Sequence, residues 1–92
     1  MLTYKAMYRF VNGGVHTEVL DFHGAIICAE SLPEAKPLLV EALVNMAKTS
    51  LLLDEPLPRP DSSCTDPDAD LEEPIHLLLT AVSRARPEAV VV

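Results

Sequence analysis

Two strand-like segments joined by a glycine-rich turn constrain the fold of this chain more than any other feature. Residues 3–11 alternate with the period of a strand, which predicts one buried face and one wetter face. The two sets of side chains are Tyr4, Ala6, Tyr8 and Phe10 on one side and Thr3, Lys5, Met7 and Arg9 on the other. Residues 12–14, Asn-Gly-Gly, tolerate the positive φ of a tight turn, and a β-rich run at residues 15–20 follows at once. The pattern therefore predicts an antiparallel hairpin.

A short apolar run at residues 25–29, Ala-Ile-Ile-Cys-Ala, predicts a third strand. It follows a turn at residues 21–24 and is β-branched in its middle. Because no polar residue interrupts the run, we expect both of its faces to be buried, either inside the sheet or under a helix.

A helix is predicted to begin at Ser31. The S-x-x-E motif that starts there has the form of a capping box, in which the serine hydroxyl and Glu34 satisfy free amide groups. The helix should end near residues 52–53, because Asp-Glu-Pro at residues 54–56 stops it. Pro37 conflicts with a helix interior and predicts a kink or a delayed start. The apolar arc of this helix is wider than one sheet needs.

The remainder of the chain divides in two. Residues 54–74 hold five of the eight prolines and eight acidic residues against one basic residue, a composition typical of an extended, solvated linker. The run at residues 75–82 fits a strand or a short helix, and we expect a strand that covers a sheet edge. The predicted organisation is a core at 1–55, an acidic, proline-rich linker at 56–74, and a strand or short helix with a tail at 75–92.

These elements predict an α+β fold of the order β-β-β-α-β, a three-stranded antiparallel sheet with one helix and a fourth strand. A chain of 92 residues has room for one such domain. Its hydrophobic content of 49% supplies enough apolar side chains for a core, which argues against disorder of the whole chain.

Charge and cysteine content exclude several classes of function. A net charge of −7 argues against nucleic-acid binding, which needs clustered Lys and Arg, and suits a basic protein partner. Cys28 and Cys64 are far apart with no C-x-x-C spacing, so we expect two free thiols in a reducing compartment. No stretch approaches the roughly 20 apolar residues of a membrane span, and the amino terminus lacks a signal core. We therefore expect a cytoplasmic protein.

The sequence contains no recognisable constellation of catalytic side chains. The three histidines, His16, His23 and His76, share no helical face, so a metal site would require them to meet only in the folded chain. The strands offer only Glu18 and Asp21 as carboxylates, with Glu30 at the step into the helix, and we interpret these as surface acids and not as the two-metal site of a nuclease. We therefore expect no enzymatic activity, no metal ion and no cofactor.

The acidic residues of the linker region are the one functional signal that we weigh. The candidate partner-binding residues are Glu55, Asp61, Asp66, Asp68, Asp70, Glu72 and Glu73. Such a run is either a solvated, self-repelling stretch or an electrostatic lure for a basic partner. In the second case the acidic residues would increase the association rate more than the binding affinity.

The order of these pieces resembles the HicB-like antitoxin family from about residue 4 to residue 60. The pieces are Asn12-Gly13-Gly14, Phe22-His23-Gly24, Ala29-Glu30-Ser31, Glu34-Ala35, Glu41-Ala42-Leu43 and the exit Asp54-Glu55-Pro56-Leu57-Pro58. The resemblance rests on their order and spacing together.

The resemblance implies a fold like a trimmed ribonuclease H and a role as an antitoxin. Such a protein would form a homodimer through its sheet edge or its apolar helix face, and would bind and occlude a small basic HicA-type toxin that cleaves messenger RNA. The segment after Pro74 is too short for a helix-turn-helix, which argues against direct operator binding. The alternative is an orphan domain of the same fold, acting as a structural or ligand-sensing homodimer without a toxin.

Overall fold

The amino-terminal hairpin forms as the alternation predicts. In the computed structural model, which describes residues 1–78, β1 (Leu2–Val11) pairs antiparallel with β2 (Gly14–Val19). The register places Val11 opposite Gly14, so that two residues form the turn. Gly13 has a φ of 87°, a conformation that glycine adopts without steric cost. The glycine-rich turn is therefore confirmed.

One face of the hairpin forms the core, as expected. Tyr4, Ala6 and Tyr8 are buried, whereas Phe10 near the turn is 55% exposed and departs from the prediction. Met7 points to the opposite face and is nevertheless buried. Lys5 and Arg9 on the same face contact the segment that follows the helix, so this part of the outer face is shielded from solvent.

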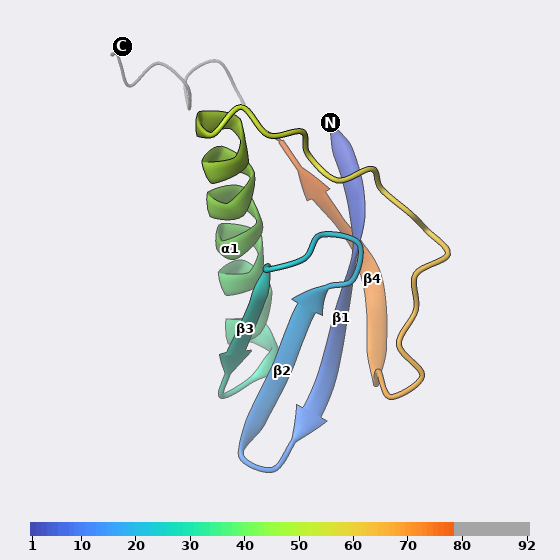
Figure 1. The fold of residues 1–92 in the computed structure, drawn as a ribbon. Coiled ribbons are helices and arrows are strands. Elements are labelled where there is room, and N and C mark those ends of the chain that lie inside the picture. Colours follow the sequence, from blue (N-terminus) through green and yellow to red (C-terminus); the bar gives the residue numbers. More distant parts are fainter. Residues whose placement is uncertain (79–92) are drawn as a thin grey trace.

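Helix α1 (Leu32–Leu52) covers the buried face of the sheet (Figure 1). Its buried residues recur at every fourth position and are Ala35, Leu39, Leu43 and Ala47. This stripe is narrower than the apolar arc of the helix, and Leu51 to Leu53 at its carboxyl end are exposed. The predicted surplus of apolar surface on the helix is therefore real.

The start of α1 agrees with the predicted cap. The Glu34 N–H donates to the Ser31 hydroxyl over 3.4 Å, and the Glu34 carboxylate accepts from the Glu30 N–H over 3.0 Å. These contacts satisfy amide groups at the start of the helix. The helix already begins at Leu32, so Pro37 lies inside it, and the predicted delayed start is wrong.

The position of β3 (Ile26–Ala29) corrects the expectation that both of its faces are buried. The sheet order is β3-β2-β1-β4, so β3 is an edge strand. Its side chains alternate in exposure, with Ile26 52% exposed and Cys28 exposed, while Ile27 packs against the core. An uninterrupted apolar run can therefore form an edge strand of which only one face is covered by a helix.

The fourth strand is present but begins earlier than predicted. β4 (Leu71–Leu77) pairs antiparallel with β1 along the opposite edge of the sheet, and the predicted residues 79–82 lie outside the described part of the chain. Pro74 lies within β4, which an edge strand tolerates because one side of its backbone is unpaired. The fold is therefore a small α+β fold, with four antiparallel strands and one helix in the order predicted.

Residues 57–70, here called the return segment, determine the direction of β4. They run from the carboxyl end of α1 along the sheet to the other end of the sheet, where β4 begins (Figure 1). A short connection after α1 would have placed the last strand parallel to β1. The length of the return segment instead makes it antiparallel.

Candidate functional site

The return segment holds most of the candidate partner-binding residues and is bound to β1 along its length. The Tyr4 hydroxyl donates to the Pro58 carbonyl over 2.7 Å, and the Asp70 N–H donates to the Tyr8 carbonyl over 2.9 Å. Between these two points, Arg9 forms an ion pair with Asp66 at 3.4 Å. Residues 56–74, which we expected to form an extended, solvated linker, thus include a segment that polar groups of the sheet bind, and residues 71–74 belong to β4.

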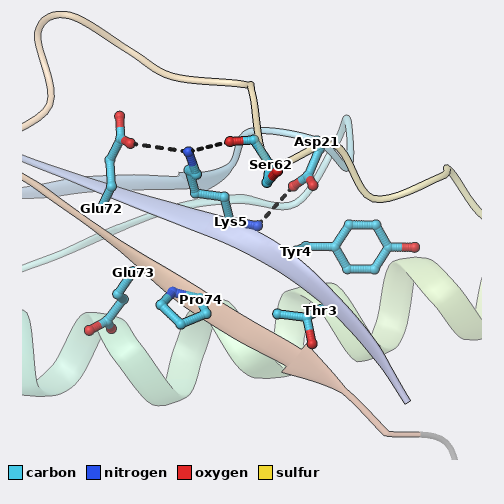
Figure 2. A pocket seen from close by; sticks show the side chains of 8 residues that line it. All are labelled: Thr3, Tyr4, Lys5, Asp21, Ser62, Glu72, Glu73 and Pro74. Carbon is cyan, nitrogen blue, oxygen red and sulfur yellow. Dashed lines mark hydrogen bonds and ion pairs between the residues drawn. The ribbon is translucent and has the colours of Figure 1, made fainter.

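Lys5 is the central anchor of the return segment. Its Nζ donates to the carbonyl oxygens of Ser62 and Cys64 over 2.8 and 2.7 Å, and lies 3.6 Å from the Glu72 carboxylate. Figure 2 shows the ammonium group between the segment and β4. Hydrogen bonds to a charged donor are stronger than those between neutral groups, so this contact holds the segment firmly.

Asp21 is the second anchor and comes from the turn between β2 and β3. One carboxylate oxygen accepts from the Lys5 N–H over 2.9 Å, and the other accepts from the Asp61 N–H over 2.8 Å. A single side chain thus joins the sheet to the beginning of the acidic run. Figure 2 shows Asp21 beside Ser62 at this junction.

Glu72 organises the middle of the acidic run from β4. Its carboxylate accepts from the Asp66 N–H over 3.0 Å and from the Thr65 hydroxyl over 2.8 Å. These hydrogen bonds, together with the positive charge of Lys5, lower the pKa of Glu72. The carboxylate is therefore held in its charged form.

Asp61 and Cys64 form a tight turn at the amino-terminal end of the acidic run. The Asp61 carboxylate accepts hydrogen bonds from the hydroxyl and the N–H of Ser63, and these lower its pKa. Burial, followed by the charges of Asp61 and Asp21, raises the pKa of Cys64. This thiol is therefore disfavoured as a nucleophile.

Glu73 faces the helix side of the sheet and not the acidic run. Its carboxylate accepts from the Tyr8 hydroxyl over 3.0 Å and pairs with Lys36 of α1 at 3.2 Å. Burial, then the hydrogen bond and the charge of Glu73, raise the pKa of Tyr8 far above its usual range. Glu73 therefore serves mainly to join α1 to β4.

The candidate acidic residues thus divide into two groups. Five of them accept hydrogen bonds or form ion pairs within the fold: Asp61, Asp66, Asp70, Glu72 and Glu73. Glu55 and Asp68 are exposed, and their side chains have no partner among residues 1–78. These two residues carry charges that an external partner can reach without competing with internal contacts.

The sequence did not identify Lys5, Arg9 and Asp21 as the residues that position this surface. A usable signal was present, because Lys5 and Arg9 lie on the same face of β1 and the chain has only seven basic residues against 14 acidic ones. Which acidic residues they would contact depended on the path of the return segment.

A shallow, open pocket of about 310 Å³ lies beside these anchors. It is lined by Thr3, Tyr4, Lys5, Asp21, Ser62, Glu72, Glu73 and Pro74 (Figure 2). Lys5, Asp21 and Glu72 already bind one another or the return segment, so the chief polar groups of the pocket stabilise the fold. Within residues 1–78 no cluster of three His, Cys, Asp or Glu side chains is arranged to hold a metal ion.

Comparison with known protein families finds none that matches this sequence, and no curated protein is similar enough to be called a relative. The likeness to HicB-like antitoxins therefore rests on the order of sequence features alone. In the described part of the chain, no helix combines the length and the apolar character needed to cross a membrane.

Proposed function

We propose that this chain is a cytoplasmic protein-binding module of the HicB antitoxin type, which binds and occludes a small basic HicA-type toxin that cleaves messenger RNA. The observation that carries the proposal is the acidic return segment, which hydrogen bonds and an ion pair hold against the sheet. The β-β-β-α-β order, which the resemblance also implies, supports the same interpretation.

A fixed acidic surface suits recognition of a basic protein better than a flexible tail does. A flexible tail must be ordered when it binds, and that ordering costs free energy. Here the backbone of the acidic run is already bound to β1 and β4 before any partner arrives. The exposed charges of Glu55 and Asp68 can then attract a basic partner at little entropic cost.

A second candidate function is a homodimer without a toxin, and the exposed apolar surface favours it. Leu52 and Leu53 at the end of α1 are 87% and 62% exposed, and Ile26 on the β3 edge is 52% exposed. An edge strand without charged residues is able to pair with another strand. Both features also fit an antitoxin that acts as a dimer, so the presence of a toxin is what separates the two candidates.

The experiment is a purification of the tagged full chain from its native host, with mass spectrometry of any protein recovered in stoichiometric amount. A recovered partner is then purified alone and tested for cleavage of RNA with and without this chain. The proposal expects a small basic partner whose cleavage of RNA stops at an equimolar ratio. Recovery of a homo-oligomer alone would favour the second candidate.

A control distinguishes inhibition from activity of the chain itself. The purified chain without a partner is incubated with the same RNA, in the presence and absence of Mg²⁺. We expect no cleavage, since the expected function is binding. Cleavage that co-purifies with the chain through successive columns would contradict the proposal and establish an enzyme.

A further inference from the structure

Three side chains on the outer face of the sheet form a line of contacts that the proposed function does not use. Cys28 on β3 lies directly opposite His16 on β2, and Glu18 is on the same face of β2. His16 Nδ1 is 3.9 Å from Cys28 Sγ, and His16 Nε2 is 3.2 Å from a Glu18 carboxylate oxygen. The imidazole therefore lies between a thiol and a carboxylate.

The carboxylate determines which ring nitrogen of His16 holds a hydrogen. Glu18 is a hydrogen-bond acceptor, so the neutral ring carries its hydrogen on Nε2 and leaves Nδ1 as an acceptor. Nδ1 is the nitrogen that faces Cys28, so it is placed to take the thiol proton. The imidazolium formed in this way would lie between two negative groups, the Cys28 thiolate and the Glu18 carboxylate, which stabilise it.

The surroundings leave this thiol open to reagents. Cys28 is exposed, and the side chains of His16 and Glu18 are 23% and 30% exposed. Arg9 lies opposite His16 on β1, but its guanidinium is paired with Asp66 at 3.4 Å, and Glu30 follows directly after β3. On the other side of the sheet, α1 packs against the core.

The second cysteine of the chain has the opposite environment. Cys64 is half-buried, and burial, with the charges of Asp61 and Asp21, raises its pKa. It has no histidine contact among residues 1–78. The same molecule therefore carries one thiol beside a base and one thiol beside acids.

We propose that Cys28 is a reactive thiol that forms mixed disulfides with small-molecule disulfides, with His16 as its base and Glu18 as a positioning residue. The thiol proton passes to His16 Nδ1, and Cys28 Sγ attacks one sulfur of the disulfide. A bond forms between the two sulfurs while the bond within the small disulfide breaks, and the other half leaves as a thiolate that takes up the proton. Cys28 is oxidised and the small disulfide is reduced.

Exchange with 2-hydroxyethyl disulfide, an uncharged probe, tests this proposal on the full chain. The adducts at pH 7 are located and followed by mass spectrometry, and we expect Cys28 to react faster than Cys64. His16→Gln should slow the reaction of Cys28 about threefold and move its pH profile to higher pH. The effect is modest because a stabilised thiolate is also a weaker nucleophile. Glu18→Gln should slow the reaction less than His16→Gln.

His23→Gln is the matched control, since His23 is exposed and its side chain forms no hydrogen bond or ion pair within residues 1–78. It should leave the rate at Cys28 unchanged. In urea, where the contacts of the sheet are lost, Cys28 of the wild-type chain should lose its advantage over Cys64. Equal rates for wild type and His16→Gln, or faster reaction of Cys64 in the folded chain, would overturn the proposal.

Discussion

At the scale of single residues, a few charged side chains hold a long acidic segment in place. Lys5 binds two backbone carbonyls and Glu72, while Asp21 binds two backbone amides. The hydrogen bonds to the Cys64 carbonyl and from the Lys5 N–H are partly buried, so these contacts are shielded from water. The candidate binding surface therefore depends on residues that do not themselves form its exposed charges.

Replacing Lys5 tests this dependence. Lys5→Met keeps an apolar stem but removes the donor to Ser62 and Cys64, so we expect a loss of about 2 kcal/mol in the free energy of unfolding. Urea denaturation followed by circular dichroism measures this loss. Lys48→Met on the exposed face of α1 is the control and should change stability little. Equal losses for the two variants would show that Lys5 is not an anchor.

The lowered pKa of Glu72 predicts how stability depends on acid. Because the folded pKa lies below that of the unfolded chain, the charged group stabilises the fold above about pH 4.5, the ordinary pKa of a glutamate. That contribution is lost as the pH falls through the lower folded value. Glu72→Gln should therefore have a lower urea midpoint than wild type at pH 7, and this difference should shrink by pH 2.5. Glu55→Gln, whose side chain is exposed, should follow the wild type at both pH values.

At the scale of secondary-structure elements, two features of α1 act in opposite directions. The cap at Ser31 and Glu34 satisfies amide groups at the start of the helix. Pro37 lies beyond the first turn and has no N–H for the Pro33 carbonyl four residues earlier. The burial of the stripe at Ala35, Leu39, Leu43 and Ala47 offsets that loss, because packing supplies most of the stability of a helix in a protein.

The two prolines of α1 provide a matched pair of substitutions. Pro37→Ala restores an N–H in the helix interior and should stabilise the chain by up to about 3 kcal/mol. Pro33→Ala alters the first turn, where a proline is tolerated because its N–H is not needed, and should be nearly neutral. Thermal unfolding of both variants separates these effects. A stabilisation by Pro33→Ala as large as that by Pro37→Ala would contradict this account.

At the scale of the whole molecule, the return segment joins the helix, the sheet and the acidic surface into one unit. It carries the chain along the sheet so that β4 pairs antiparallel with β1 (Figure 1). Its contacts also determine which acidic residues stay exposed, and Asp68 and Glu55 are the ones without internal partners in residues 1–78.

Proteolysis distinguishes a bound segment from a linker. A protease that cleaves after acidic residues should cut the native chain after Asp61 and Asp68 at least about tenfold more slowly than it cuts a free peptide of residues 56–74. Lys5→Met should speed cleavage of the native chain by releasing the segment. Equal rates for the native chain and the peptide would mean that the segment is unbound.

The exposed acidic residues should govern the rate of association with a basic partner. Once a partner is in hand, the double variant Glu55→Gln/Asp68→Asn should associate more slowly at low salt and show a weaker salt dependence, with dissociation unchanged. Asp66 and Asp70 are unsuitable for this test because they bind Arg9 and the Phe10 N–H within the fold. Glu30→Gln/Glu41→Gln removes the same charge elsewhere and should have a smaller effect on association. An identical salt dependence of the association rate for both double variants would contradict a specific role of Glu55 and Asp68 in attracting the partner.

The local elements of this protein follow from patterns in its sequence. Alternation at residues 3–11, the turn at Gly13 and the cap at Ser31 act between neighbours in the chain, so the hairpin and the helix start were predictable. The order of the elements and the α+β class follow directly from them. The acidic composition of residues 54–74 was equally plain, and so were the candidate residues that it contains.

Features that depend on contacts between distant residues became visible only in the folded chain. The run at residues 25–29 is apolar whether it lies inside a sheet or at an edge, so its place beside β2 could not be read from composition. The return segment resembles a linker in composition, yet Lys5, Arg9 and Asp21 bind it from 40 to 59 positions away in the chain. The proximity of Cys28 to His16 likewise arises from the pairing of β2 with β3. Such pairings depend on strand register and chain path, which no local pattern encodes.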